Sequence, residues 1–245
     1  MINIVVPLAG KGSSFKEKGE LFPKNLVEIN GKPMIEWVIS SLKIDIKHRF
    51  IFIIRNEDFK DYSFSYTLRL LSSDSEIVVA QQETAGSVCS ALLAIDFINN
   101  EQPLIIVNGD QIIQDNLFEQ GINYFIRKSF DGGIITFPAV HPKWSYVRLD
   151  ENNYVIEVAE KKPISKNATA GVYYFRKGLD FVNAAFRMIR KDIRTLGQFF
   201  VCPVYNELIL DGRKIGVFSI EKEKMISLGT PEEVNQFKNK SVFGG

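Results

Sequence analysis

The sequence is poor in the residues that bind metals or cross-link small secreted proteins. It has 2 cysteines and 2 histidines among 245 residues. Cys89 and Cys202 lie far apart without CxxC spacing, and neither His48 nor His141 has a partner at the spacing of a zinc-ligand pair. These absences exclude a disulfide framework and argue against a zinc site or a catalytic histidine. They are typical of a protein from a reducing compartment.

The chain also lacks a strong charge of one sign and a long apolar run. Its 30 basic residues balance 29 acidic ones, and no dense basic tract is present, which excludes a general nucleic-acid binder. The longest apolar runs, at 50–54 and 104–107, are far shorter than the roughly 18 to 20 residues of a membrane helix. No basic segment of a signal peptide precedes the first apolar run. The sequence therefore predicts a cytoplasmic protein with neither a nucleic-acid nor a membrane partner.

No Ser/Pro/Gly-rich linker and no internal repeat divides the chain. A hydrophobic fraction of 45%, with 17 Gly and 9 Pro, is ordinary globular composition. A chain of this length buries a stable core without cross-links. We therefore expect one domain over residues 1–240.

Short β-branched runs alternate with amphipathic stretches, which is the pattern of an α/β protein. Strands are expected at 2–8, 49–54, 76–80, 103–108, 133–138, 146–150, 154–158, 170–175 and 215–220. Helices are expected at 33–42, 59–71, 87–97, 117–127, 179–190, 204–210 and after residue 231. The first strands are continuously apolar, as buried parallel strands are. The prediction is a mixed, mostly parallel sheet flanked by helices, with halves at 1–130 and 131–240.

A glycine-rich loop follows the first predicted strand. Its residues are Leu8, Ala9, Gly10, Lys11, Gly12, Ser13 and Ser14. Glycines without a Cβ atom allow backbone amides to turn toward phosphate oxygens. The spacing matches neither a Walker loop nor a dinucleotide-binding fingerprint. Taken alone, the loop leaves a purely structural turn open.

Further motifs follow in a fixed order along nearly the whole chain. They are Pro-Lys-Asn-Leu at 23–26, Gly-Lys-Pro-Met at 31–34, Gln81 with Gly86, Gly-Asp at 109–110, Glu-Lys-Lys-Pro at 160–163, Ala-Gly-Val-Tyr at 170–173 and Gly-Thr-Pro-Glu-Glu at 229–233. Together they resemble the nucleotidylyltransferases that make nucleoside-diphosphate sugars and related activated alcohols. The resemblance implies a Rossmann-like fold. It also implies that an acceptor phosphate attacks the α-phosphorus of a nucleoside triphosphate and that pyrophosphate leaves.

By this resemblance Lys24 and Asp110 are the catalytic candidates. Lys24 would neutralise the triphosphate, and Asp110 would hold Mg²⁺ at a strand end where open α/β sheets bind ligands. The loop at 8–14 would cradle the triphosphate. Three residues would line the nucleotide site beyond it: Gln81, Gly86 and Ser87. Gln82 is a rival of Gln81 for the contact with the base. The structural alternatives are that Lys24 is a solvated surface lysine and that Asp110 only forms part of a turn.

The resemblance also implies an acceptor site made by Glu160, Lys161, Lys162 and Gly171. Glu160 corresponds to the family glutamate that contacts the acceptor hydroxyls, and one of the two lysines to the residue that binds the acceptor phosphate. On a strand, neighbouring side chains face opposite ways, so one lysine would face the acceptor and the other the solvent. Gly171 corresponds to a family glycine whose backbone lies against the acceptor.

Two positions depart from the family pattern. Ser14 stands where the glycine-rich loop usually has an arginine, and Lys11 is the candidate replacement. Ser227 stands where an aspartate, a second metal ligand, commonly precedes the late Gly-Thr pair. These departures leave open a non-catalytic nucleotide-binding regulator. A nucleotide-sugar-dependent glycosyltransferase is less favoured, because 108–110 reads Asn-Gly-Asp instead of Asp-x-Asp.

The resulting prediction is a nucleotidyltransferase (EC 2.7.7.-) that uses Mg²⁺. The compact loop followed by Phe15 looks more like the cytidylyl branch of the family, so CTP is favoured. The predicted acceptor is a sugar 1-phosphate or a non-sugar phosphate such as phosphocholine or phosphoglutamine, activated for capsule or surface polysaccharide synthesis. The sequence leaves a homo-oligomer open.

Overall fold

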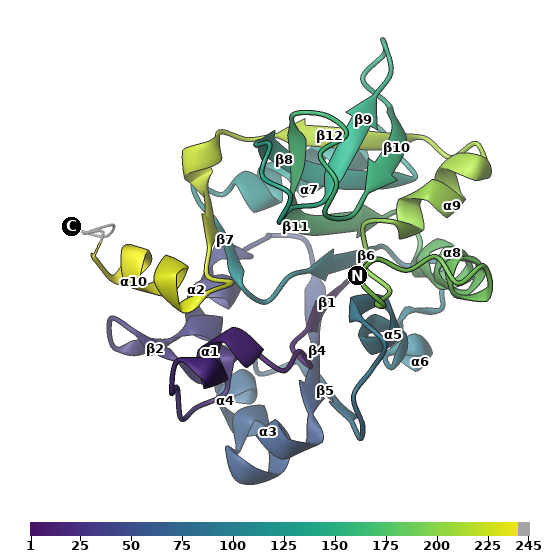
Figure 1. Ribbon diagram of the computed structural model, residues 1–245. Coiled ribbons are helices and arrows are strands. Elements are labelled where there is room, and N and C mark those ends of the chain that lie inside the picture. The colour runs from purple at the N-terminus through teal and green to yellow at the C-terminus, as the bar shows by residue number, and fades with distance from the viewer. Residues whose placement is uncertain (240–245) are drawn as a thin grey trace.

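A nine-stranded sheet forms the centre of the computed structural model, which describes residues 1–239 (Figure 1). The predicted domain end at residue 240 lies outside the described residues. Four parallel neighbours are, in spatial order, β6 (Leu104–Val107), β1 (Ile2–Pro7), β4 (His48–Arg55) and β5 (Glu76–Ala80). Ile4 pairs with Phe50 on one side and Ile105 on the other. The continuous apolar runs are thus buried parallel strands, as predicted.

The chain after residue 130 extends this sheet through one long strand. β11 (Asn167–Phe175) pairs antiparallel with β6, β8 and β9. The other added strands are β8 (Gly132–Pro138), β9 (Tyr146–Leu149), β10 (Val155–Ala159) and β12 (Ile215–Ser219). β10 pairs antiparallel with β9, and β12 runs parallel to β8. β10 and β11 therefore oppose the common direction of the remaining strands, and the predicted mixed, mostly parallel sheet is confirmed.

The sheet has helices on both of its faces and separates two apolar cores (Figure 1). β1 sends Ile4 and Val6 into one core and Val5 into the other. The helices are α1 (Ser13–Glu17), α2 (Met34–Ser41), α3 (Asn56–Asp61), α4 (Phe64–Leu71), α5 (Ser87–Leu92), α6 (Ile95–Ile98), α7 (Leu117–Arg127), α8 (Gly178–Arg190), α9 (Val204–Leu210) and α10 (Pro231–Asn239). Within residues 1–239, no helix has the length and apolar character needed to cross a membrane.

Some element boundaries differ from those expected. The helix expected at 59–71 is α3 and α4, because Ser63 between them adopts a left-handed φ of 51°. The helix expected at 87–97 is likewise two pieces, α5 and α6. The helix expected from 33 begins at Met34, because Pro33 is extended with ψ 146°.

Four short strands were not expected: β2 (Glu28–Ile29), β3 (Lys32–Pro33), β7 (Gln111–Ile113) and β13 (Met225–Ser227). β7 and β13 form an antiparallel ribbon in which Ser227 lies opposite Gln111. The amide of Leu228 donates a hydrogen bond to the carbonyl oxygen of Asp110 at 2.7 Å. The ribbon therefore brings the late Gly-Thr motif beside the turn that follows β6.

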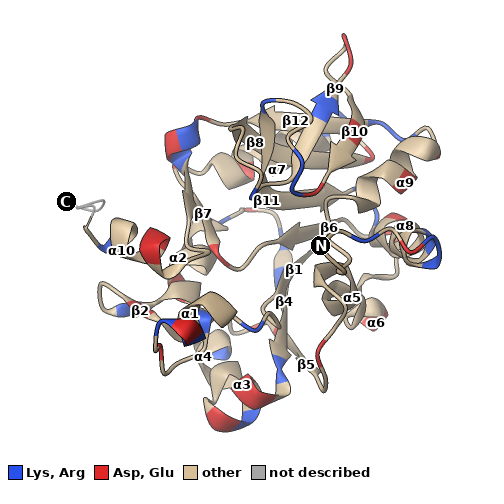
Figure 2. Cartoon of the chain, viewed as in Figure 1, with Lys and Arg blue, Asp and Glu red and all other residues tan. Residues whose placement is uncertain are grey.

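Charges of both signs are interspersed over the outer helices and loops (Figure 2). This distribution agrees with the net charge of +1. The candidate site must therefore obtain its charge from individual side chains and not from a charged face.

Candidate active site

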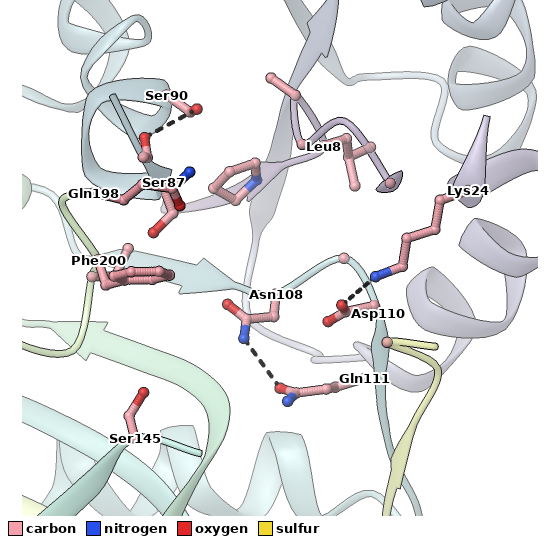
Figure 3. A pocket seen from close by; sticks show the side chains of 18 of the residues that line it. Leu8, Lys24, Ser87, Ser90, Asn108, Asp110, Gln111, Ser145, Gln198 and Phe200 are labelled. Carbon is pink, nitrogen blue, oxygen red and sulfur yellow. Dashed lines mark hydrogen bonds and ion pairs between the residues drawn. The ribbon is translucent and has the colours of Figure 1, made fainter. Parts of the chain in front are cut away.

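A cavity of about 650 Å³ opens at the carboxyl ends of β1 and β6. Residues from both halves of the sequence line it. Figure 3 shows Lys24 and Asp110 on one side of the cavity and Ser87, Gln198 and Phe200 on the other. This is the end of the sheet at which open α/β folds bind ligands.

Most of the predicted site residues line this cavity: Leu8, Ala9, Gly10, Lys11, Gly12, Ser13, Lys24, Gly86, Ser87, Asp110, Glu160 and Lys161. Ser14, Gln81, Lys162 and Gly171 are not part of the lining. Ser14 lies exposed in α1, and Gln81 lies exposed after β5. The contact of Gln81 or Gln82 with a base stays a prediction.

The glycine-rich loop presents free hydrogen-bond donors to the cavity. Within the part of the chain that the structure describes, the amides of residues 9–14 donate no hydrogen bond to protein acceptors. Lys11, the predicted substitute for the loop arginine, pairs instead with Glu83 at 2.7 Å, and both side chains are 58% exposed. The loop therefore offers amide donors for an anion, and its lysine forms an exposed ion pair with another residue of the lining.

The two catalytic candidates form an ion pair, although 86 positions separate them in the sequence. Lys24 Nζ lies 2.6 Å from Asp110 Oδ2, with side chains 18% and 29% exposed. Lys24 opens the short 3-10 turn η1 (Lys24–Leu26), and Asp110 follows β6. A cation and a carboxylate are thus positioned together where β1 and β6 end.

Glu233 brings a carboxylate to the position where the family has an aspartate and this chain has Ser227. The hydroxyl of Ser227 donates to Glu233 Oε2 at 2.8 Å, and the amide of Thr230 donates to the same oxygen at 3.1 Å. The Glu233 amide returns a bond to Thr230 Oγ1 at 3.3 Å, which completes a capping box for α10. Lys143 binds the other carboxylate oxygen at 2.5 Å. The sequence did not lead us to expect Glu233 as a site residue, although the Thr-Pro-Glu-Glu pattern of a capping box is present.

The donor set of the cavity fits a magnesium ion that is shared with substrate. Asp110 and Glu233 supply hard oxygen donors at one edge, as Mg²⁺ prefers. Within residues 1–239, no three His, Cys, Asp or Glu side chains gather in a way that could hold a metal ion. Mg²⁺ commonly uses one or two carboxylates plus phosphate oxygens, so this arrangement suits a substrate-bound ion better than a protein cage.

Gly86 lines the cavity and also packs closely against the backbone of a second lining segment. Its φ is 124°, and a Cβ there would lie 2.5 Å from the carbonyl oxygen of Phe199. That oxygen accepts a bond from the Val88 amide at 3.1 Å, and the Phe199 amide donates to Ala85 at 2.8 Å. The start of α5 therefore fixes the segment at 198–202, which supplies part of the cavity wall.

The segment at 160–163 is not the strand that was expected. β10 ends at Ala159, and Lys161 adopts a left-handed φ of 54°. The alternation of a strand therefore does not apply. Lys161 lines the cavity with its Nζ 5.5 Å from the centre of the Phe200 ring, whereas Lys162 is exposed and outside the lining.

Glu160 is half-buried and accepts a hydrogen bond from the Ser145 hydroxyl. Burial raises the pKa of Glu160 above its ordinary value, and the Ser145 bond and nearby Lys161 offset this rise in part. Tyr173 is buried beside it, and burial raises the pKa of this phenol well above its ordinary value. The Tyr173 hydroxyl shares a 2.9 Å hydrogen bond with Thr169 Oγ1. This end of the cavity is therefore neutral apart from Glu160 and Lys161.

Gly171 lies outside the cavity lining but makes room for two side chains that belong to it. Its φ is 68°, and a Cβ there would fall 1.7 Å from Gln111 Oε1 and 2.8 Å from Asn108 Nδ2. Asn108 and Gln111 line the cavity and are joined by a 3.4 Å hydrogen bond (Figure 3). The missing side chain thus makes room for this amide pair, and a direct contact with the acceptor stays a prediction.

A sequence model of the family described as nucleotidyl transferase matches residues 6–192. The chain belongs to this family. This membership is what its motifs predicted. The match covers the glycine-rich loop, Lys24, Asp110 and the segment at 160–163, whereas the cavity residues at 198–202 and 227–233 lie beyond it.

Relatives of this nucleotidyl transferase are found among curated proteins and solved structures. The bifunctional protein GlmU of Methanocaldococcus jannaschii is 26% identical over 222 residues, covering 88% of this chain and 49% of the relative. The chain spans about half the length of the curated relatives it matches. The nucleoside-diphosphate-sugar pyrophosphorylase from Vibrio cholerae RC9 superposes with a TM-score of 0.83 at 26% identity, covering 97% of this chain and 99% of that one.

A further solved structure, the inositol-1-phosphate CTP transferase from T. maritima, superposes with a TM-score of 0.74 at 14% identity. It covers 97% of this chain and 96% of that one. At this identity the likeness concerns the fold, which is that of the nucleotidyl transferase family.

Proposed function

We propose that this nucleotidyltransferase joins a nucleoside triphosphate to the phosphate of a small acceptor and releases pyrophosphate. The observation that carries the proposal is the Lys24–Asp110 pair, which lies beside free loop amides in the cavity that also contains Glu160 and Lys161. One cavity thus holds groups for a triphosphate, a metal ion and a second phosphate.

The proposed reaction is one in-line displacement. An oxygen of the acceptor phosphate forms a bond to the α-phosphorus, and the bond from that phosphorus to the oxygen bridging to the β-phosphorus breaks. Pyrophosphate leaves with the electron pair of the broken bond. Charge builds on the phosphoryl oxygens, so preorganised donors and cations lower the barrier.

In this proposal each half of the cavity binds one substrate. The amides at 9–13 and Lys24 bind the triphosphate, and Lys161 binds the acceptor phosphate. Asp110, with Glu233 nearby, would hold Mg²⁺. Bound Mg²⁺ supplies charge neutralisation on phosphate oxygens. When phosphate and metal enter, Lys24 and Asp110 exchange their contact with each other for contacts with them.

We favour CTP as the nucleotide. The compact loop followed by Phe15 supports this choice. Sugar phosphates and non-sugar phosphates are both acceptors of the proposed class, and the activated product would serve surface polysaccharide synthesis. Because nucleoside triphosphates are cytoplasmic metabolites, we place the reaction in the cytoplasm.

Pyrophosphate release tests this function. The purified chain is incubated with Mg²⁺, each of the four nucleoside triphosphates, and glucose 1-phosphate, phosphocholine or O-phosphoethanolamine. We expect release that needs both substrates and is fastest with CTP. The control variant is Lys16→Met, an exposed lysine of α1 outside the cavity, which should match the wild type.

A different outcome would identify the regulatory alternative. A nucleotide that raises the melting temperature without any pyrophosphate release would contradict the proposed transfer and favour a nucleotide-binding regulator.

A further inference from the structure

Most, but not all, of the charged residues that line the cavity form ion pairs with one another. Four lysines and four carboxylates line it: Lys11, Lys24, Lys143 and Lys161, with Glu83, Asp110, Glu160 and Glu233. Three ion pairs use six of them, at 2.7 Å for Lys11–Glu83, 2.6 Å for Lys24–Asp110 and 2.5 Å for Lys143–Glu233. Glu160 and Lys161 are the two left over, and neither forms an ion pair with any residue in the range 1–239.

The side chains of these two sequence neighbours contact different groups. Lys161 adopts a φ of 54°, and its ammonium group lies 5.5 Å from the centre of the Phe200 ring. The Glu160 carboxylate instead accepts a hydrogen bond from Ser145 Oγ. The two side chains thus form no direct ion pair, although the charge of Lys161 lies near enough to lower the pKa of Glu160.

The surroundings of Glu160 supply no second cation. Its neighbours in the lining are the neutral groups Ser145, Thr169, Tyr173 and Cys202. The hydroxyls of Thr169 and Tyr173 are engaged with each other at 2.9 Å. Burial raises the pKa values of Tyr173 and Cys202 well above their ordinary values, so both groups stay neutral.

We infer that the acceptor is a zwitterion, a phosphate monoester that also carries an ammonium group, with the phosphate at Lys161 and the ammonium at Glu160. This inference rests on the proposed function, which places the acceptor phosphate at Lys161. Once a phosphate occupies Lys161, Glu160 keeps a half-buried negative charge whose hydrogen-bond partner, the Ser145 hydroxyl, is neutral, and such a charge is unfavourable. An ammonium group supplies charge and hydrogen bonds together, whereas a hydroxyl supplies a hydrogen bond alone.

Two acceptors of equal length isolate this difference. O-phosphoethanolamine carries an ammonium group, and ethylene glycol monophosphate carries a hydroxyl in its place. Calorimetry measures the Kd of each, and pyrophosphate release with Mg²⁺ and the best nucleotide measures kcat/KM. The proteins are the wild type, Glu160→Gln, and the control Glu157→Gln, which alters a carboxylate of β10 that lies outside the cavity.

We expect the wild type to bind the ammonium acceptor about tenfold more tightly than the hydroxyl acceptor, the scale of one charge-assisted hydrogen bond. Glu160→Gln should bring the two Kd values within about twofold of each other, and Glu157→Gln should keep the wild-type ratio. Equal Kd values in the wild type, absence of binding by both acceptors, or a ratio that survives Glu160→Gln would overturn the inference.

The two readouts separate this inference from the proposed function. Pyrophosphate release with both acceptors at equal kcat/KM would uphold nucleotidyl transfer and overturn the zwitterion. A Kd ratio that depends on Glu160, without pyrophosphate release from any nucleotide and acceptor, would uphold the charge recognition and contradict nucleotidyl transfer.

Discussion

The proposed nucleotide side and the proposed acceptor side of the cavity hold their charges differently. On the nucleotide side, Lys11 and Lys24 each contact a carboxylate. On the acceptor side, Glu160 and Lys161 form no ion pair with each other. Paired lysines must exchange one partner for another when a phosphate arrives, which reduces the net gain in binding free energy. Charges without an ion-pair partner can bind a substrate without first breaking such a contact.

This contrast suggests that the two sides recognise their substrates in different ways. A triphosphate with Mg²⁺ brings both an anion and a cation, so it can take over both members of the Lys24–Asp110 pair. The acceptor brings no metal of its own, so its recognition depends on the charges that it carries. The predictions below test this contrast, from the largest expected effect to the smallest.

Lys24→Met should give the largest loss. Methionine keeps the apolar stem that packs near Gly12 and Phe15 but removes the ammonium group. We expect kcat/KM for the nucleotide to fall by about 10²-fold or more, the scale of losing one preorganised charge-stabilising group. Steady-state kinetics beside Lys16→Met measure the effect. Kinetics like those of the wild type would remove Lys24 from the nucleotide side.

Asp110→Asn should shift the dependence on Mg²⁺. The substitution keeps the shape of the side chain and removes its charge, so the ion is held less tightly. At limiting Mg²⁺ we expect a rate loss of about 10²-fold, partly recovered at high Mg²⁺. A second readout is the Mg²⁺ needed for CTP to raise the melting temperature. Asp115→Asn, at an exposed carboxylate paired with Lys224, is the control. An unchanged Mg²⁺ titration would place the metal elsewhere.

Lys161→Ala should raise the KM of the acceptor roughly tenfold or more, because an anionic phosphate loses its cation. The KM of the nucleotide should stay the same. Lys162→Ala provides a matched neighbour that is exposed and outside the lining, and it should change neither KM. The contrast between the two sides fails if Lys161→Ala raises the nucleotide KM instead.

Glu160 should make acceptor use depend on pH. Burial raises its pKa above the ordinary value, so its carboxylate takes up a proton at a higher pH than a solvated glutamate does. Protonation removes the negative charge, so kcat/KM for O-phosphoethanolamine should fall several-fold as the pH decreases through this raised pKa. The ratio of wild type to Glu160→Gln cancels the titration of the acceptor phosphate. A ratio independent of pH would contradict this role.

The nucleotide side was largely predictable from the sequence. The loop at 8–13, Lys24 and Asp110 lie in contiguous motifs that follow buried parallel strands, and the carboxyl ends of such strands meet at one edge. The parallel strands were predictable for a related reason, because burial on both faces leaves a continuous apolar run.

The acceptor side was less predictable because distant loops build it. Phe200 and Cys202 enter the cavity wall through hydrogen bonds between the segments at 85–88 and 198–201, which no local pattern signals. The left-handed backbone of Lys161 is equally invisible in a run of charged residues, so a strand was expected there. Lys143 forms an ion pair with Glu233, which lies 90 positions later in the sequence.

Identification of the reaction product by ³¹P nuclear magnetic resonance tests the central claim most directly. The wild type is incubated with CTP, Mg²⁺ and O-phosphoethanolamine. We predict two coupled resonances of a diphosphate that joins cytidine to the acceptor, together with an equal amount of pyrophosphate, and neither product with Lys24→Met over the same time. Hydrolysis of CTP to CMP or CDP with the acceptor phosphate left unchanged would contradict the claim that one cavity joins both substrates.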